Sequence, residues 1–168
     1  MQVHRRRVVI TGVGLVSPLG VGTAETWQGL LDGRSGVGPI THFDTTGYGT
    51  RIAGEVKDFD PAQFVDKKEV KKSDRFIHLA LAAAQFALRD SGFVVTEENA
   101  DQVGVDVGSG IGGFPLIERT HTILMEKGPD RVSPFFIPTT LANMAAGIVA
   151  IYAQSIYEVA TGHGEGYF

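Results

Sequence analysis

The sequence predicts an α/β domain in which short apolar strands alternate with helices. Apolar runs at residues 8–11 and 103–107 each end in glycines, and helical segments lie between and after them. Such runs are typical of strands that are covered on both faces. With 168 residues, of which 43% are apolar and 20% charged, the chain has a globular composition and enough length for one core.

Two strands are expected in the first half of the chain. Val8 to Thr11 is a β-branched run followed by Gly12 and Gly14, which predicts a buried strand that ends in a close-packed loop. Residues 34–66 are mixed, and within them residues 51–59 predict a short edge strand.

Cap and stop residues define two helices in the same half. The first is expected from Thr23, a candidate N-cap, to Gly33, and it has one apolar face formed by Trp27, Leu30 and Leu31. The second is expected from Ser73 to Gly92, where an alanine-rich, apolar middle predicts a buried helix.

The second half continues the alternation. After the strand at 103–107 we expect a helix over 115–127, a loop over 128–138 and a helix over 139–154. A third core strand is expected to begin in residues 155–162. The small residues of the last helix predict very close packing on a neighbour: Ala142, Ala145, Ala146, Gly147 and Ala150.

Composition excludes several classes of function. A net charge of -4 argues against nucleic-acid binding. The sequence contains no run of 18 apolar residues, so no membrane span is expected. We therefore expect a cytoplasmic protein. The absence of cysteine excludes disulfides, thiolate metal sites and a cysteine nucleophile within these residues. No metal or cofactor is expected, because four histidines lack metal-ligand spacing and are interpreted as structural: His4, His42, His78 and His121.

The segment GSGIGGF, residues 108–114, is the most distinctive motif. Gly108, Gly110 and Gly113 fit the dinucleotide pattern G-x-G-x-x-G, but no strand that ends in an acid follows at the required distance. Glu126 is near that distance and falls in a predicted helix. A tight turn that needs glycine for positive φ explains the motif equally well.

Several blocks together resemble the β-ketoacyl-acyl-carrier-protein synthases, most closely the type II elongating enzymes. They are RRVVITGVGLVSPLG, DRFIHLALAAAQFALRDSG, GSGIGG and SPFFIPTTLANMAAG, and the match is collinear over about residues 5–151. The resemblance implies a thiolase fold, in which two similar α/β halves pack in five layers, usually as a homodimer. The family's chains are more than twice as long, so residues 1–168 are expected to form a single incomplete N-terminal domain.

The resemblance also implies a reaction. An acyl group passes from a carrier-protein thioester to a cysteine, and the carbanion from decarboxylated malonyl-carrier protein attacks it. One alignment places residues 159–163 on the motif of that cysteine, and another places residues 160–165 just beyond it. Neither supplies a cysteine, and the tail over 155–168 diverges. The family's two histidines and lysine lie further downstream. His163 is an isolated histidine to which we assign no role.

Acyl-pocket residues carry over by motif. Ile111 matches the isoleucine that gates the acyl pocket in the family, and Phe136 matches a phenylalanine that lines the pocket from across the dimer. The loop glycines are then expected to turn the backbone beside an acyl chain: Gly108, Gly110, Gly112 and Gly113. The alternative is that Ile111 and Phe136 are ordinary core residues.

A basic segment, DKKEVKKSD, stands out in an acidic chain. Lys68, Lys71 and Lys72 match family positions that dock the acidic carrier protein, and Arg131 matches another. Asp130 departs from a basic position beside it. The alternative is a solvated helix face, which explains most charge runs.

Three hypotheses remain open. The first is a synthase of which this chain is a part. The second is a non-catalytic partner subunit that sets chain length, and the third is an inactive truncated fragment with exposed apolar surface.

Overall fold

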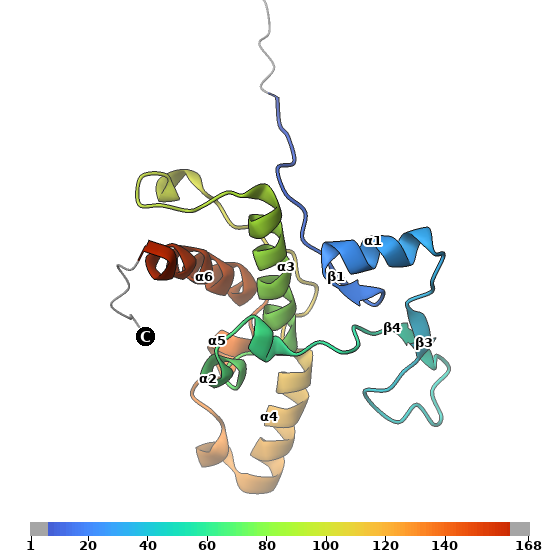
Figure 1. The fold of residues 1–168 in the computed structure, drawn as a ribbon. Helices are drawn as coiled ribbons and strands as arrows, with labels where there is room; N and C mark the ends of the chain where they lie inside the picture. The colour runs from blue at the N-terminus through green and yellow to red at the C-terminus, as the bar shows by residue number, and fades with distance from the viewer. Residues whose placement is uncertain (1–6, 162–168) are drawn as a thin grey trace, which may run out of the picture.

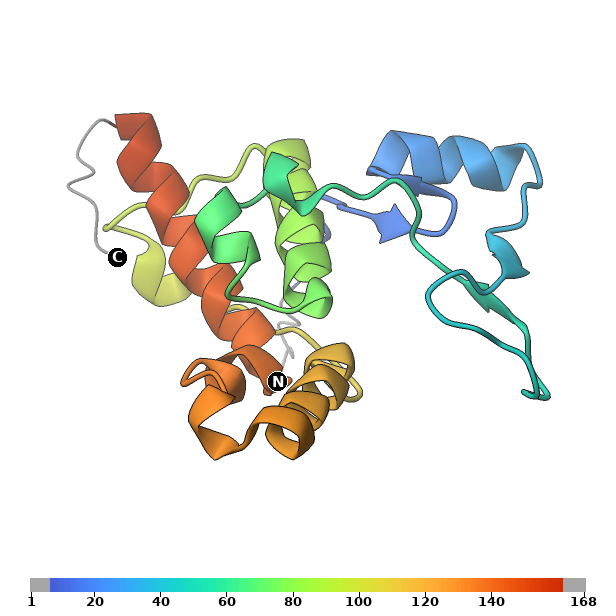
Figure 2. The ribbon, with the colours of Figure 1, turned by 90° about the horizontal axis from the view of Figure 1, so that it is seen from below.

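The long helix α3 (Arg75–Ser91) lies at the centre of the fold, with the other segments arranged around it (Figure 1). The structure is a computed structural model that describes residues 7–161. Helix α6 (Met144–Thr161) crosses α3 and makes extensive contact with it. Helices α4 (Phe114–Lys127) and α5 (Phe136–Thr140) lie near the N-terminal end of α3, as Figure 2 also shows.

Helix α3 begins slightly later than the sequence predicts and ends where expected. Asp74, not Ser73, is its N-cap residue, and the carboxylate accepts a hydrogen bond from the Arg75 amide at 2.5 Å. Ser73 instead donates its hydroxyl hydrogen to the carbonyl of Glu69. Gly92 ends the helix with φ of 64°, a left-handed conformation that costs glycine little.

Two apolar clusters beside α3 form the core. In the first, Ile77 and Leu81 are buried one helical turn apart and pack against Ala145 and Val149 of α6. Burying a side chain of this size contributes about 1.5–3 kcal/mol. The second cluster contains Phe59, Phe64 and Ala82. Helix α3 is therefore buried as predicted, and it connects both clusters.

The region predicted as a loop and one helix contains two helices. Helix α5 occupies the end of the predicted loop 128–138 and the first residues of the predicted helix 139–154. The chain then becomes extended at Leu141, with φ of -66° and ψ of 133°, and α6 begins at Met144. Such a break was not visible in the apolar pattern, which continues through it.

Helix α6 corrects the expectation for the end of the chain. It continues to Thr161, so residues 155–161 are helical and the predicted third strand is wrong over them. Ala145 is fully buried against α3, as close packing requires, whereas Gly147 and Ala150 are exposed. His4, His163 and the last part of the divergent tail lie outside the described residues. None of the helices in residues 7–161 is long and apolar enough to cross a bilayer.

Strand pairing in residues 7–161 is limited to two short antiparallel ladders. Strand β1 (Val16–Ser17) pairs with β2 (Gly20–Val21), and β3 (Val37–Pro39) pairs with β4 (Ile52–Gly54). The β3–β4 register places Gly38 opposite Ala53. Strand β4 confirms the predicted edge strand at 51–59 over residues 52–54, whereas residues 55–59 are not a strand.

The predicted strands at 8–11 and 103–107 do not pair with a neighbour in the described chain. Val8 and Ile10 are 94% and 86% exposed, so nothing covers the first segment. In the second, burial alternates with a period of two, and Val105 and Val107 pack on the α3–α6 cluster. Since a strand is stabilised by hydrogen bonds to an adjacent strand, these segments remain extended but unpaired.

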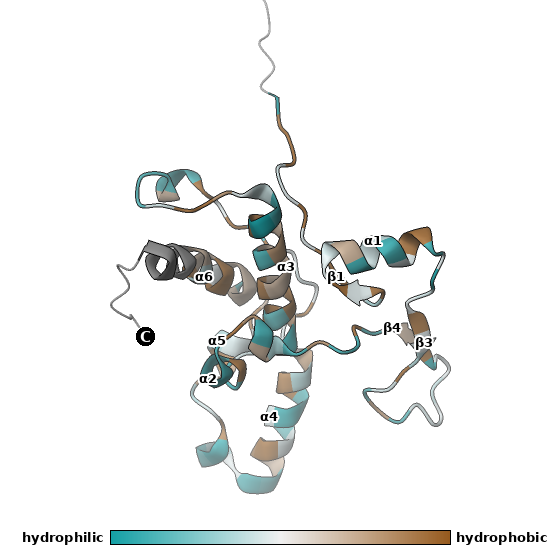
Figure 3. Ribbon diagram, in the orientation of Figure 1, coloured by the Kyte–Doolittle hydropathy of each residue, from teal (hydrophilic) through white to brown (hydrophobic). Residues whose placement is uncertain are grey.

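Helix α1 (Thr23–Leu31) forms as predicted, with Gly22 rather than Thr23 as its N-cap. Its buried residues are Thr26 and Gly29, which face the β1–β2 hairpin. The predicted apolar face exists but is uncovered: Trp27, Leu30 and Leu31 are each more than half exposed, and the outer end of α1 is strongly apolar in Figure 3.

The close-packed loop after residue 11 is confirmed. A Cβ on Gly12 or Gly14 would overlap the carbonyl oxygens of Ala87 and Ala83, respectively. The amide of Val13 donates a hydrogen bond to the Asp90 carboxylate at 2.8 Å. The N-terminal segment therefore lies directly on the backbone of α3.

Candidate functional site

The glycine-rich turn at 108–113 is held against the C-terminal end of α5. Gly112 has φ of 80°, and a Cβ there would overlap the carbonyl oxygen of Thr140. Gly113 donates its amide hydrogen to the same oxygen at 3.0 Å. A Cβ on Gly113 would also lie 3.1 Å from the carbonyl oxygen of Thr139. Close approach and positive φ thus require glycine at position 112, whereas at position 113 a side chain would be tight.

The first half of the motif is different, because Gly108 and Gly110 face open space in the described chain. The turn does lead into a helix, as a phosphate site would. However, the amide of Leu116, in the first turn of α4, already donates a hydrogen bond to the buried carboxylate of Asp74 at 3.0 Å. A negative charge of the protein itself occupies this position, which disfavours the phosphate interpretation.

Ile111 and Phe136 lie on adjoining segments. Ile111 immediately precedes the Gly112 contact with Thr140, and Phe136 begins the short helix that ends at Thr140. Ile111 is 67% exposed and Phe136 is half-buried. The alternative, that both side chains belong to the core, does not fit the exposure of Ile111 in the described part of the chain.

The lysine segment is only partly helical. Helix α2 (Lys67–Val70) is capped by Asp66, whose carboxylate accepts a hydrogen bond from the Lys68 amide at 2.7 Å, and it ends before Lys71. Lys72 therefore lies beyond the helix, where its Nζ is 2.6 Å from Oε1 of Glu69. Lys68 and Lys71 are exposed and form no ion pair with the side chains of residues 7–153.

Arg131 lies in a separate place. It ends the 3₁₀ turn η3 (Pro129–Arg131), which contacts α4, whereas α2 contacts η1 (Pro61–Gln63). Arg131 lines a shallow hollow together with Ile123 and Lys127. Lys127 is a second cation that motif matching missed, although its spacing of four residues from Arg131 was visible in the sequence.

His78, treated as structural from the sequence, is a buried residue with a defined partner. Its Nε2 lies 2.8 Å from Oγ of Ser73, just before α3. Burial lowers the pKa of the His78 imidazole, while the negative charge of Asp74 acts in the opposite direction. The spacing of five residues between Ser73 and His78 carried no recognisable signal.

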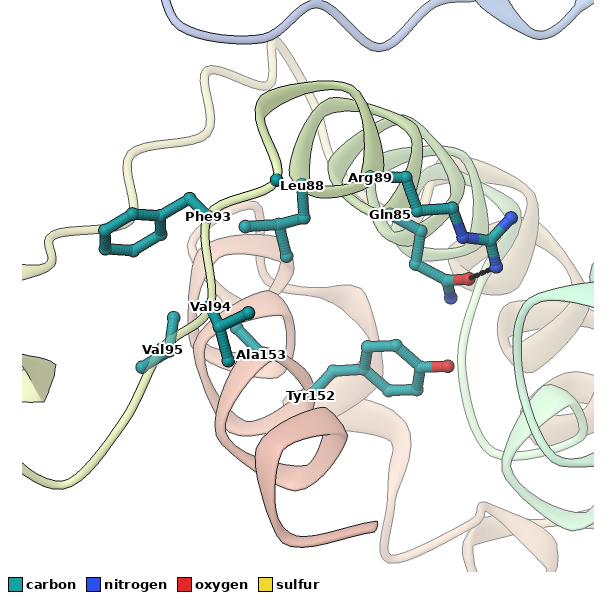
Figure 4. A pocket seen from close by; sticks show the side chains of 9 residues that line it. Gln85, Leu88, Arg89, Phe93, Val94, Val95, Tyr152 and Ala153 are labelled. Carbon is teal, nitrogen blue, oxygen red and sulfur yellow. Dashed lines mark hydrogen bonds between the residues drawn. The ribbon is translucent and has the colours of Figure 1, made fainter. Parts of the chain in front are cut away.

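An apolar hollow of about 350 Å³ lies between the end of α3, the following loop and α6 (Figure 4). On one side, Nη2 of Arg89 donates to Oε1 of Gln85 at 3.3 Å, and Gln85 donates from Nε2 to the carbonyl of Phe64. Burial raises the pKa of Tyr152 on the opposite side. No sequence pattern indicates this hollow, because its residues come from segments far apart in the chain: Gln85, Leu88, Arg89, Gly92–Val95, Tyr152 and Ala153.

A buried carboxylate ties the β3–β4 loop to β4. Glu55 accepts hydrogen bonds from the amide and the hydroxyl of Thr41, at 2.9 and 2.8 Å, and from the amide of His42 at 3.2 Å. The hydrogen bond from the Thr41 amide is the main cause that lowers the pKa of Glu55. Among the side chains of residues 7–153, no three His, Asp or Glu groups gather as metal ligands would.

Comparisons with known proteins agree with the resemblance. Residues 5–155 match the family described as "Beta-ketoacyl synthase, N-terminal domain". The chain is 51% identical over 148 residues to 3-oxoacyl-[acyl-carrier-protein] synthase 2 of Synechocystis sp., and 53% identical over 147 residues to the enzyme of that name from Vibrio harveyi. These alignments cover 88% of this chain but only 36% and 35% of those proteins.

Solved structures give the same result for the backbone. The fold matches a structure described as the ishigamide ketosynthase/chain length factor, with a TM-score of 0.74 and 34% identity. It also matches a β-ketoacyl synthase from Burkholderia phymatum STM815, with a TM-score of 0.70 and 28% identity. Each match covers 89% of this chain and 38% or 37% of the other.

Proposed function

We propose, from the premise that this chain belongs to the β-ketoacyl synthase family through its N-terminal domain, that it forms the acyl-pocket and carrier-docking part of a 3-oxoacyl-[acyl-carrier-protein] synthase. The observation that carries the proposal is the identity of about half its residues to two synthases of that name. The chain spans about a third of their length, so the activity belongs to a longer protein.

In the proposed reaction, a cysteine thiolate takes the acyl group from a carrier-protein thioester and releases the carrier thiol. Malonyl-carrier protein then loses CO₂, and the resulting carbanion attacks the acyl thioester. The product is a 3-oxoacyl-carrier protein two carbons longer, and the cysteine is regenerated. These 168 residues contain no cysteine, so the nucleophile lies outside them.

Within this scheme the glycine-rich turn carries the pocket gate. The packing of Gly112 and Gly113 on Thr140 holds the turn, which leaves the Ile111 side chain exposed beside α5. An apolar side chain in that position suits contact with an acyl chain. Phe136 would contribute to the pocket of a second copy, in a cytoplasmic homodimer.

The exposed lysines supply the docking part of the proposal. Lys68 and Lys71 are exposed cations in an acidic chain and have no ion pair among the side chains that the structure describes. Such charges accelerate encounter with an acidic carrier protein. Arg131 and Lys127 form a second basic position near the end of α4.

The decisive assay uses the longer protein that contains this chain. Incubated with acyl- and malonyl-carrier protein, it should release CO₂ and form a 3-oxoacyl-carrier protein, detected by mass spectrometry. No product with any acyl length, from a protein that has its cysteine, would refute the proposal.

A non-catalytic chain-length partner is a second candidate, because one matched structure pairs a ketosynthase with a chain length factor. The two candidates differ in acyl transfer. A synthase gains the mass of the acyl group on incubation with acyl-carrier protein, whereas a partner without the cysteine does not. A purified protein whose intact mass is close to 18.0 kDa would indicate the truncated fragment.

A further inference from the structure

We propose that Asp74 is a positioning residue for the acyl-pocket gate: its carboxylate joins the N-termini of α3 and α4 and thereby fixes where Ile111 stands. The inference rests on the proposed function for the role of Ile111 as the gate of the acyl pocket. The contact itself rests on geometry alone.

Asp74 bridges two helices that are far apart in sequence. One carboxylate oxygen accepts from the Arg75 amide at the start of α3, and the other accepts from the Leu116 amide, 42 residues away, at 3.0 Å. The side chain is buried, with 6% exposure. Hydrogen bonds to a buried carboxylate are stronger than neutral ones, so this bridge is stiff.

Helix α4 depends on this carboxylate because it has no cap of its own. Its N-cap is Gly113, which has no side chain, and its first turn contains no acidic residue. Pro115 offers no amide hydrogen, and the Leu116 amide shares its hydrogen between the Gly113 carbonyl at 3.1 Å and Oδ2 of Asp74 at 3.0 Å. Asp74 thus supplies the negative charge that a helix N-terminus favours.

The bridge acts directly on the turn that carries Ile111. A Cβ on Gly113 would lie 3.0 Å from Oδ2 of Asp74, so the carboxylate packs against the last residue of the turn. On its other side Gly113 is bonded to Thr140. Two residues before Gly113, Ile111 has a backbone fixed by these contacts and a side chain that remains exposed.

Asp74 differs in this respect from an ordinary capping residue. Asp60 is the N-cap of the 3₁₀ turn η1 and is exposed, and its carboxylate accepts a hydrogen bond from the amide of Ala62, two residues away. Asp60 therefore provides a matched control, because it is an aspartate cap that does not contact the glycine-rich turn.

The experiment compares Asp74→Asn and Asp60→Asn in the complete synthase. Asparagine keeps one acceptor oxygen, which can cap α3, but its amide group cannot accept the Leu116 hydrogen bond. Asp74→Ser serves as a second variant if Asp74→Asn folds poorly, since serine caps α3 and is too short to reach α4. Hydrogen exchange at the Leu116 amide and kcat/KM for a series of acyl lengths are measured for each.

Both Asp74 variants should exchange the Leu116 amide roughly fivefold faster, the effect of losing one cap. They should also change the ratio of kcat/KM between the longest and shortest acyl groups by more than about threefold, because a displaced gate affects long chains selectively. Asp60→Asn should change neither quantity.

Two results would overturn the inference. One is unchanged exchange at Leu116, and the other is an equal fall in kcat/KM for every acyl length, which general destabilisation would produce. A parent enzyme without condensing activity would refute the proposed function instead, and hydrogen exchange would then decide the Asp74 contact on its own.

Discussion

Gly113 donates its amide hydrogen to the carbonyl oxygen of Thr140 at 3.0 Å, and this bond joins the glycine-rich turn to α5. Helix α5 contains only five residues, and the hydroxyls of Thr139 and Thr140 donate back to carbonyls one turn earlier. The turn is therefore fixed by a short helix that is itself internally hydrogen-bonded.

The glycines of the turn should differ in their tolerance of a side chain. Gly112→Ala should lower the free energy of unfolding by at least about 2 kcal/mol, because the residue has positive φ and its Cβ would overlap Thr140. Gly110→Ala should stay within about 1 kcal/mol, since its Cβ meets open space. Urea unfolding of both variants measures the difference, and equal losses would contradict the structure.

Ile111→Phe should shorten the longest acyl group that the complete synthase accepts. The larger ring would occupy space beside α5 that the proposed acyl chain needs. Met125→Phe provides the control, because Met125 is 72% exposed on α4 and away from the turn. If both variants keep the parent's chain-length profile, Ile111 is not the gate.

Lys68 and Lys71 should matter more for carrier docking than Lys72. The ammonium of Lys72 is already paired with Glu69, whereas the other two are exposed without an ion pair in the described residues. Lys68→Glu with Lys71→Glu should raise KM for the carrier substrate roughly tenfold at low salt, and less at high salt. Lys57→Glu, another exposed lysine, tests whether net charge alone is responsible. An unaltered KM in the double variant would leave the segment as solvated surface.

His78 should make the protein less stable in mild acid. Burial lowers its pKa from the ordinary value of 6.5, so the unfolded chain binds more protons than the folded chain as pH falls below 6.5. The free energy of unfolding should therefore decrease from pH 6.5 downwards and be fully retained above it. His78→Gln should flatten this decrease, whereas His121→Gln, on the exposed side of α4, should not. Parallel pH profiles for the two variants would exclude His78 as the cause.

Trp27 should report on the uncovered face of α1. It is the only tryptophan, and it is 58% exposed in this chain. Acrylamide should quench its fluorescence readily in residues 1–168, and less in a longer protein if further residues cover α1. Shielded fluorescence in the short chain at low concentration would contradict the exposed position.

Local signals predicted α1, α3 and α4 well, but they missed α5 and the true bounds of α6. The stop at Gly92, the start of α1 and the span of α4 each depend on residues within one or two turns of the helix end. The strands at 8–11 and 103–107 depend instead on partners distant in the chain, and the apolar pattern contains no information about whether such partners are present. The same limit applies to α1: the sequence shows its apolar face, but it does not show whether another segment covers that face.

The candidate site was predictable only where a motif marked it. Ile111 and the glycines stand in a recognisable block, so their positions followed from resemblance. Asp74 lies 42 residues from Leu116, and nothing in the spacing connects them. The ion pair between Lys72 and Glu69 was visible as a three-residue spacing, but it depends on the turn that ends α2.

The docking of Gly12 and Gly14 on α3 has a consequence for how the chain folds during synthesis. Val13 meets its partner Asp90 across 77 positions of sequence, and the surface under the two glycines is the backbone around Ala83 and Ala87. A ribosome adds residues from the N-terminus, so the first segment leaves the exit tunnel long before its binding surface exists. Helix α3, by contrast, can form from its own local contacts. Residues 12–14 are thus made well before the α3 surface on which they settle.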